Sequence, residues 1–395
     1  MKDEPRPIIA LGCEYPLSVR GGVTILVEEL IAGLSQEFRV VLISPDRKID
    51  IEEREGVHEH IFWEPRAVSR ATSRSLAKQL ANSNVRLAHL HFGGVFGWGV
   101  RVPGQSPFPF LARTGIASVS TSHLVVSILN GYCDEKKSFA FKLALLPVAW
   151  LGKLSALRHV QTEIVVSIAG CKKLQRWYRP LQNRFRHVYH SRIHPESLSS
   201  SAVPREQMIV CVGHIAFRKG QHILADAFAQ AAHQLPGWKL VLVGHNAEEA
   251  CWRQIEEIAT RSHLRGRIQL IGRHEDVSDF FKRAAIYVQP SLFEGLPLSL
   301  QEAMFQGCAC IATAVDGNLE LIDNESNGLL VPVNQPAAMA AGLVRLASDT
   351  SLRDKFSVRA RESILRKEMT APRMVGHYIE LYKTILASPK RSIFR

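Results

Sequence analysis

The apolar positions of this chain fall into short runs that alternate between two periods. Runs rich in valine, isoleucine and leucine, bounded by glycine, proline or polar residues, predict buried strands. Between them apolar residues recur at helical spacing. Repeated strand–loop–helix units predict an α/β protein with doubly wound parallel sheets. We expect strands at 7–13, 38–44, 85–92, 117–122, 162–167, 186–189, 208–212, 238–244, 268–271, 286–288 and 310–314.

The helical segments and one polar interruption predict two domains. The stretch 190–204 is serine-rich and carries two prolines, as linkers do. We therefore assign residues 1–195 to a first Rossmann-like domain, 196–205 to a linker, 206–371 to a second Rossmann-like domain, and 372–395 to a C-terminal helix with a basic tail. Helices are expected at 23–35, from 222 onward, and at 248–263, 277–283, 298–306, 337–348, 352–365 and 373–386.

Composition and the N-terminal sequence indicate a cytoplasmic protein without a zinc site. The chain has 395 residues, which is enough for two domains of ordinary size. Its seven cysteines contain no C-x-x-C pair and mostly lie in apolar runs, so we expect reduced core residues and no zinc site. The charged start MKDEPRP does not resemble a signal peptide, and we expect a cytoplasmic protein.

Positive charge is concentrated in the first domain. The net charge is +12, and residues 136–192 carry 12 basic residues against Glu163 alone. The segment 139–151 is apolar and interspersed with lysine. Two interpretations remain open: a core helix with a solvated basic side, or an amphipathic surface helix that contacts anionic lipid at the inner face of a membrane. A nucleic-acid binder is disfavoured because aromatic interleaving is absent.

The stretch from 287 to 332 carries the strongest chemical signal. A strand ends at Val288, a loop holds Glu294, and a helix from Leu298 to Gly307 holds Glu302. In an open α/β sheet such a loop lies at the carboxyl end of a strand, where ligands bind. Loop amides and a helix N-terminus favour an anion, whereas two glutamates favour hydroxyl groups. Phosphate together with a polyol indicates a nucleotide sugar.

The same stretch resembles the donor site of the retaining GT-B glycosyltransferases of family four. The shared frame is PS-x-x-EG-x-P-x-x-x-x-EA-M-x-x-G, with Asp316-Gly317, Glu320 and 327–331 downstream. The resemblance implies two Rossmann-like domains facing each other across a cleft, with the C-terminal helix crossing back to the first. It also implies that Glu294 binds the hydroxyls of the donor sugar and Glu302 those of the ribose.

Further donor-binding positions follow from the resemblance. It places the loop Gly295, Leu296, Pro297 and Leu298 on the donor, the end of a strand at Gly244 close to it, and Arg273 with His274 around the base.

A basic loop before the second domain's first helix suits a diphosphate, because backbone amides and cations converge there. Lys219 matches the family's lysine, and Arg218 lies beside it. His214 stands where the family has an arginine. Ser191 to His194 replace the usual Asn-Gly turn, so a donor or hinge role for those four positions is not supported by the resemblance.

The first domain supplies three further candidates. Gly21 and Gly22 precede a helix, where the resemblance places a loop between donor and acceptor. His123 ends a predicted strand, and the resemblance places a histidine there beside the transferred sugar. His89 and His91 alternate at another strand end; they fit structural histidines better than metal ligands, since no third ligand is near in sequence.

These residues predict a glycosyltransferase with His123, Lys219 and Glu294 as its catalytic groups. No Asp-x-Asp pair is present, so we expect no metal and no cofactor besides the nucleoside diphosphate sugar. The expected acceptor is a glycan or a lipid-linked or cell-surface glycan precursor. The alternative is a non-catalytic subunit that binds nucleotide sugar, which the His214 substitution favours. A sugar-nucleotide epimerase shares the architecture but does not explain the paired glutamates.

Overall fold

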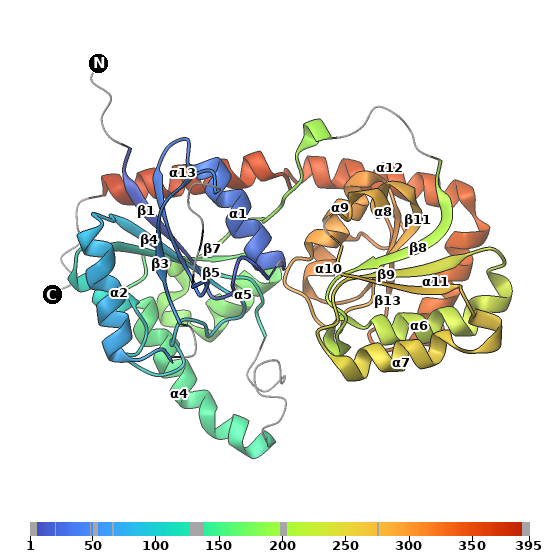
Figure 1. The fold of residues 1–395 in the computed structure, drawn as a ribbon, viewed down its shortest axis with the longest axis horizontal. Helices are drawn as coiled ribbons and strands as arrows, with labels where there is room; N and C mark the ends of the chain where they lie inside the picture. The colour runs from blue at the N-terminus through green and yellow to red at the C-terminus, as the bar shows by residue number, and fades with distance from the viewer. Residues whose placement is uncertain are drawn as a thin grey trace. The chain divides into compact units, whose positions relative to one another are not determined.

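The computed structural model describes residues 6–19, 21–47, 49, 54–64, 67–126, 138–197, 204–274 and 276–388. Cys133, the acidic pair Asp134-Glu135, linker residues 198–203 and the basic tail from Lys390 lie outside the described residues. The chain divides into two compact units, residues 1–190 with 372–395 and residues 191–371. Each unit is built on one parallel sheet (Figure 1).

The first unit holds a seven-stranded sheet in the order β3-β2-β1-β4-β5-β6-β7. All six pairings are parallel, for example Ile9 with Val40 and with Leu87. Its elements are β1 (Ile8–Cys13), α1 (Gly22–Leu34), β2 (Arg39–Ser44), β3 (Val57–Phe62), α2 (Arg70–Asn82), β4 (Leu87–Phe92), α3 (Phe108–Arg113), β5 (Ala117–Ser122), α4 (Phe139–Leu157), β6 (Thr162–Val165), α5 (Ile168–Trp177), the 3-10 segments η3 (Arg179–Arg184), β7 (Phe185–His187) and the last helix α13 (Ala371–Ala387).

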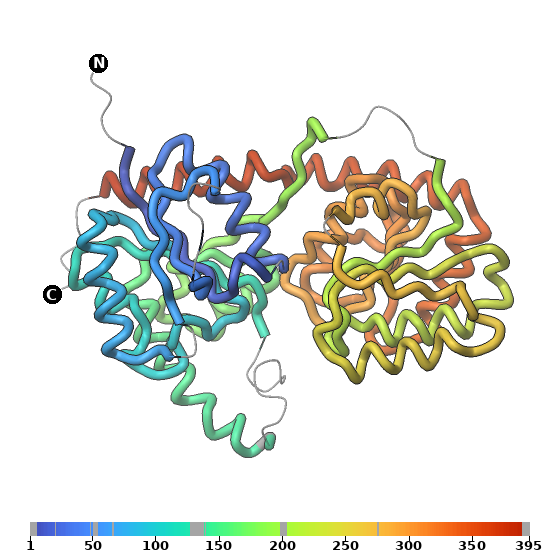
Figure 2. Tube along the Cα trace, in the orientation of Figure 1, coloured from blue at the N-terminus to red at the C-terminus, as the bar shows by residue number. Residues whose placement is uncertain are grey.

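The second unit holds a six-stranded sheet in the order β10-β9-β8-β11-β12-β13. Figure 2 shows the chain of this unit alternating between the sheet and its covering helices. Its elements are η4 (Pro195–Ser197), β8 (Glu206–Val212), η5 (Phe217–Lys219), α6 (Gln221–Ala231), η6 (Ala232–Gln234), β9 (Lys239–Val243), α7 (Glu249–Ala259), η7 (Ser262–Leu264), β10 (Ile268–Gly272), α8 (Ser278–Arg283), β11 (Ala284–Gln289), α9 (Leu298–Gln306), β12 (Ala309–Thr313), α10 (Asp316–Leu321), β13 (Leu329–Val331), α11 (Pro336–Ser348) and α12 (Thr350–Arg366).

The predicted strands are confirmed. They could be recognised in the sequence because central parallel strands are buried on both faces. Every residue of β11 and β12 is buried, which gives the apolar runs seen in the sequence, and β4 is buried throughout although it carries His89 and His91. The six described cysteines are free and buried, as expected. Strand β3 was missed, since it lies at the sheet edge and its sequence VHEHIF mixes buried and exposed positions. The short elements α3, α10 and β13 and the polar helix α2 were missed as well.

Helix α13 follows the second unit in sequence yet belongs to the first, as the resemblance implied. Its side chains bond to the first sheet. Tyr378 Oη lies 2.6 Å from His190 Nε2 and 3.2 Å from Thr121 Oγ1, and Tyr382 shares a hydrogen bond with His89. Both tyrosines are fully buried, so α13 is fixed to this sheet by polar contacts inside an apolar layer.

Each sheet reverses its strand order once, and this places the functional loops. In the first sheet the reversal lies between β1 and β4, and in the second between β8 and β11. Loops that leave neighbouring strands there diverge to opposite faces of the sheet and leave a crevice at the carboxyl ends. The loop after β8 carries Lys219 and the loop after β11 carries Glu294, so the predicted donor residues meet at the reversal of the second sheet.

Candidate functional site

Lys219 and Glu294 meet at the reversal between β8 and β11. The Lys219 Nζ atom lies 2.6 Å from Glu294 Oε1, and Arg218 Nη1 lies 3.8 Å from the same oxygen. The Glu294 side chain is only 7% exposed, so this carboxylate is held between two cations in a largely dry setting. The sequence placed Lys219 on the diphosphate and Glu294 on the sugar without predicting that the two would touch.

Gly220, the residue after Lys219, allows the loops after β8 and β11 to approach each other closely. Gly220 has φ +72° and caps η5, and a Cβ added there would lie 2.0 Å from the carbonyl oxygen of Pro290. Glycine is therefore required for the loop after β8 to approach the loop after β11. The Leu292 backbone N–H also donates to Arg218 O at 2.9 Å, which joins the two loops directly.

Buried polar side chains complete the surroundings of Glu294. Ser291 Oγ donates to Glu294 Oε1 at 2.7 Å, and Gln289 Nε2 donates to the same atom at 3.1 Å. Tyr287 Oη in turn donates to Gln289 Oε1 at 2.5 Å. Sequence reasoning missed Gln289 and Tyr287. The sequence marks Gln289 only as the polar last residue of an otherwise apolar strand.

The charge states of this cluster follow from burial and pairing. Burial by itself raises the pKa of Glu294, but Lys219, Arg218 and the hydrogen bond from Ser291 together hold that pKa below its usual value. Burial lowers the pKa of the Lys219 ammonium, and the nearby Glu294 carboxylate opposes this. Glu294 is thus ionised at neutral pH.

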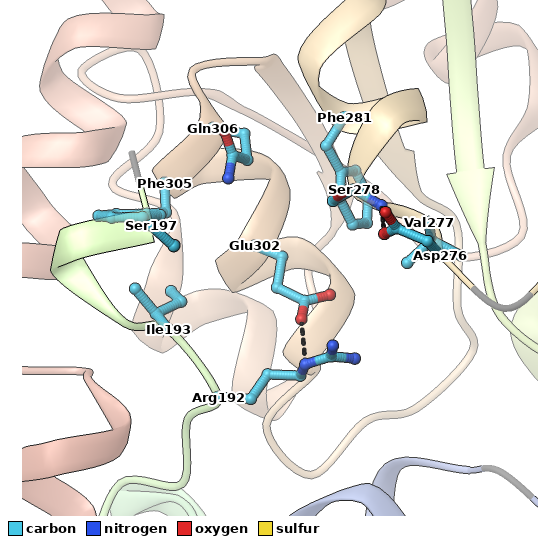
Figure 3. A pocket seen from close by; sticks show the side chains of 10 residues that line it. All are labelled: Arg192, Ile193, Ser197, Asp276, Val277, Ser278, Phe281, Glu302, Phe305 and Gln306. Atoms are coloured by element: carbon cyan, nitrogen blue, oxygen red, sulfur yellow. Dashed lines mark hydrogen bonds and ion pairs between the residues drawn. The ribbon is translucent and has the colours of Figure 1, made fainter. Parts of the chain in front are cut away.

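Glu302 lies in a different setting, on the second turn of α9. Its Oε1 lies 2.9 Å from Arg192 Nε, in a pocket that Figure 3 shows between the chain after β7 and helices α8 and α9. Asp276 and Ser278 line the same pocket. Arg192 belongs to the four positions for which the resemblance supported no donor role, so its pairing with a predicted ribose ligand is a finding of the tertiary structure.

Burial raises the pKa of Glu302 to about 7, against the opposing effect of Arg192, and the negative charge of Asp276 raises it further. The side chain is 17% exposed and Arg192 is 39% exposed. The two glutamates of the family frame therefore differ near neutral pH. Glu294 is held ionised by two cations, and Glu302 is close to its titration midpoint.

His214 occupies the position of the family's arginine and has a histidine as its partner. His214 Nδ1 lies 2.7 Å from His245 Nδ1, and the rings cross at 67° with their centroids 4.1 Å apart. Burial lowers the pKa of His214 to about 4, and His245, Lys219 and Arg218 lower it as well. Without a ligand, His214 is neutral at pH 7 and does not replace the arginine charge.

The remaining predicted donor residues surround these groups in sequence and on the sheet. Gly244 follows β9, and Arg273 and His274 follow β10, where both are exposed. His274 Nδ1 lies 2.7 Å from the Asp276 carbonyl oxygen. The four loop residues after Glu294 lead into α9, which begins at Leu298 with Pro297 as its N-cap. Their contact with a donor stays a prediction.

His123, Gly21 and Gly22 belong to the first unit. Gly21 caps α1, and Gly22 is the first residue of that helix. His123 follows β5 and its Nε2 lies 3.1 Å from His91 Nδ1. Burial lowers the pKa of His123 to about 3, so its ring is neutral. A neutral imidazole donates or accepts hydrogen bonds but offers no full charge to a developing cation.

The histidines of β4 form a buried layer with His123. His89 bonds Thr121 at 2.7 Å and packs 4.1 Å from the His91 ring. Burial lowers the pKa of His89 to about 3 and that of His91 well below its usual value. No cluster of three or more metal-ligating side chains occurs among the described residues. These contacts favour the structural interpretation.

Helix α4 lacks the basic side that its sequence predicted. Its two lysines are buried, Lys142 at 8% exposure and Lys153 at 1%, and Lys153 Nζ lies 2.7 Å from Glu163 Oε2. The exposed side chains are apolar instead: Phe141, Leu143, Val148, Trp150 and Leu151. By length and composition alone, residues 140–157 could cross a membrane, which is weak evidence for a single helix. The expected solvated basic side is therefore wrong within α4.

Part of this chain matches a known protein family. Residues 196–363 match the family model "Glycosyl transferases group 1". An uncharacterized glycosyltransferase of Haemophilus influenzae is 31% identical over 154 residues, which are 39% of this chain and 43% of that protein. A putative colanic acid biosynthesis glycosyltransferase of Escherichia coli K12, WcaL, is 26% identical over 334 residues, covering 78% of this chain and 75% of that protein.

A solved structure supports the fold across both units. The crystal structure of Anabaena HepE in complex with UDP aligns with a TM-score of 0.74 over 96% of this chain and all of that one, at 16% identity. The expected GT-B architecture is thereby confirmed. The chain spans less than half the length of the Haemophilus relative in its alignment.

Proposed function

We propose that this chain, a GT-B glycosyltransferase whose residues 196–363 belong to the glycosyl transferases group 1 family, moves a hexose-type sugar from a nucleoside diphosphate sugar to an acceptor. The transfer would retain the configuration of the sugar and need no bound metal. The observation that carries this proposal is the convergence of Lys219, Arg218 and Glu294 at the reversal of the second sheet. HepE, which shares the fold, binds UDP.

The two cations would hold the diphosphate of the donor. Lys219 and Arg218 lie at the carboxyl end of β8, immediately before α6, whose free backbone N–H groups also favour an anion. In the ligand-free structure Glu294 neutralises part of this charge. A bound diphosphate would share Lys219 with Glu294 and leave the carboxylate, still ionised, to accept hydrogen bonds from sugar hydroxyls.

Charge develops as the bond between the sugar and the phosphate breaks. The electron pair of that bond leaves with the diphosphate oxygen, and the sugar gains oxocarbenium character. Lys219 and Arg218 would stabilise the departing negative charge by fixed electrostatics. The acceptor hydroxyl would attack on the face from which the diphosphate departs, and its proton would pass to a departing phosphate oxygen.

The acceptor would be a glycan or a lipid-linked or cell-surface glycan precursor at the inner face of a membrane. WcaL is named for colanic acid biosynthesis, which is consistent with a polysaccharide product. Figure 1 shows α4 projecting from the first unit, and its exposed phenylalanine, tryptophan and leucine side chains suit the boundary between headgroups and acyl chains. We therefore place the reaction in the cytoplasm, with α4 as the peripheral contact.

The test is donor consumption. The purified chain is incubated with UDP-, GDP- and ADP-sugars and a lipid extract as acceptor, and release of nucleoside diphosphate is measured. Turnover with one donor class, lost in Glu294→Gln, is the expected result. A second candidate, a non-catalytic subunit that binds nucleotide sugar, draws on His214 in place of the arginine. It predicts donor binding by thermal shift with no release of diphosphate.

A further inference from the structure

The two histidines at the ends of β8 and β9 form a proton-sharing pair beside the predicted diphosphate site. We propose that the pair of His214 and His245 takes one proton from solvent when a diphosphate binds and supplies the positive charge that an arginine gives in related enzymes. This inference rests on the proposed function and names how its leaving group would be held. The pair would make diphosphate binding depend on pH.

The backbone holds the two rings side by side. Strands β8 and β9 are parallel neighbours, and the Ile215 N–H donates to His245 O at 2.9 Å. A Cβ added to Gly244 would lie 1.9 Å from Gly213 O, so only glycine allows the two strand ends to approach this closely. Both histidines are partly exposed, which leaves them accessible to a ligand.

Proton counting at the pair follows from the bond between the two Nδ1 atoms. In the neutral pair one Nδ1 carries the proton and the other accepts it, so only one of the two Nε2 atoms can be a donor. Adding one proton makes both Nε2 atoms donors while the bond between the Nδ1 atoms remains. Among the described residues neither Nε2 bonds a protein group. Protonation therefore creates a cation with two donors directed away from the shared bond.

The charges around the pair show why a ligand would cause this protonation. Arg218 and Lys219 on η5 are the cations near His214, Glu294 lies behind Lys219, and Glu249 bonds Asn246 beyond His245. A Cβ added to Gly213 would lie 4.0 Å from Lys219 Cε, so the lysine passes over the residue before His214. Burial, then His245 and these two cations, lower the pKa of His214, so that its ring is neutral at pH 7.

A bound diphosphate reverses that balance. Arg218 and Lys219 against Glu294 give two positive charges and one negative, a net charge of +1. The diphosphate of a nucleotide sugar carries about two negative charges near neutral pH, and the released nucleoside diphosphate about one more. One proton on the histidine pair would match the donor. The same proton would stabilise the product more strongly, and so also the negative charge that develops during transfer.

Isothermal titration calorimetry with UDP, GDP and ADP measures the proton directly. At pH 7 each nucleotide is titrated in buffers of different ionisation enthalpy, and the dependence of the observed heat on the buffer gives the protons taken up. We expect wild type to take up as much as one proton more per bound nucleotide than His245→Asn does. The comparison is between the two proteins because Glu302, if it binds the ribose as a carboxylate, releases part of a proton in both. The dissociation constant should rise by up to about tenfold per pH unit between the pKa of the free pair and that of the complexed pair, where binding takes up the proton, and should level off at higher pH.

Variants assign the proton. His245→Asn should abolish the uptake and weaken binding at pH 6 toward the value at pH 8. His214→Arg should abolish the uptake yet keep strong binding at both pH values, since a fixed charge replaces the titrating one. The matched control is His233→Asn, an exposed histidine on η6, which should behave as wild type. A role in packing alone would not change the proton stoichiometry.

Two results would overturn the proposal. Equal proton stoichiometry in wild type and His245→Asn would show that the pair does not supply the charge, and the proposed transferase function would survive. Absence of binding for all three nucleotides would overturn both the pair and the function on which it rests.

Discussion

The carboxyl end of the first sheet carries neutral polar side chains, whereas that of the second sheet carries charged ones. The first unit ends its strands β4 and β5 with His91 and His123, whose pKa values burial holds far below neutral pH. The second unit ends β8 and β11 with loops that hold Lys219, Arg218 and Glu294 as charges. Fixed charges suit a diphosphate, whereas neutral rings suit hydroxyl groups. The second unit thus supplies the charges predicted to bind the diphosphate, and the first unit supplies neutral rings that suit sugar or acceptor hydroxyls.

Removing Lys219 should have the largest effect on this contrast. Lys219→Ala takes away the closest cation and leaves Glu294 buried with only Arg218 as a charged partner, so its pKa should rise. We expect kcat and kcat/KM to fall together by about 100-fold or more, on the scale of lost oxyanion donors. Steady-state kinetics with the identified donor would check this. Near-normal turnover would refute the assignment of the leaving-group site.

Glu294→Gln should produce the next largest loss. The amide keeps the shape and can still accept a hydrogen bond at its oxygen, but it removes the charge that strengthens contacts with sugar hydroxyls. The expected cost is about 2–4 kcal/mol in transition-state stabilisation, with less effect on nucleotide affinity. The measurement pairs kcat/KM with the dissociation constant of the nucleotide. A variant with full activity would exclude Glu294 from the sugar site.

Arg192 should matter through Glu302. If the carboxylate accepts hydrogen bonds from ribose, loss of the Glu302 proton near pH 7 should favour donor binding, in the direction opposite to the histidine pair. The profile is therefore measured in His214→Arg, where that pair no longer supplies a titrating charge. In Arg192→Gln the opposing cation is gone, so the pKa rises and this limb shifts to higher pH. We expect an increase of about tenfold in the donor KM at pH 7. Arg192→Lys is the matched control and should restore part of the affinity.

An unshifted pH profile in Arg192→Gln would separate Arg192 from Glu302. The kcat at saturating donor should change little in either variant, because the ribose contact is made in both the ground state and the transition state.

The neutral histidines predict acid sensitivity of the first unit. His89 has a folded pKa of about 3 against about 6.5 when unfolded, so the unfolded state binds more protons between these values. The free energy of unfolding should therefore fall as pH drops below about 6.5. Glu14 and Glu302, whose pKa values are raised to about 7, act in the opposite direction. For this reason the test compares wild type with a variant in the slope of the free energy of unfolding against pH.

Denaturant titrations of wild type and His89→Gln between pH 7 and 5 would measure those slopes. The variant lacks one titrating ring and should lose stability less steeply, whatever its absolute stability. Equal slopes would show that His89 is not held neutral.

Chelation should have the smallest effect. Because Lys219 and Arg218 are proposed to hold the diphosphate, turnover should be unchanged in excess EDTA. An activity that disappears with EDTA and returns with magnesium or manganese would show that the leaving group is held by a metal.

The sequence by itself determined most of the architecture. Central parallel strands are buried on both faces and favour apolar residues, so most strands of the two sheets were visible as apolar runs. The family frame located Glu294 and Glu302, because its glycine, proline and acidic positions lie within one loop and one helix. Edge strand β3 and the polar helix α2 escaped, since an edge or surface element can satisfy its polar groups with water and imposes less pattern on the sequence.

Only the tertiary structure decided which charges pair. Lys219 and Glu294 are 75 residues apart and Arg192 and Glu302 are 110 apart, and no local pattern relates them. The sequence shows His214 at the position of the family's arginine, but it does not reveal its partner His245, which follows the neighbouring strand. Likewise, α4 carries lysines that its sequence suggested were solvated, and one of them pairs with Glu163 in the core. Local periodicity reports burial of an element, whereas electrostatic partners depend on how strands are ordered in the sheet.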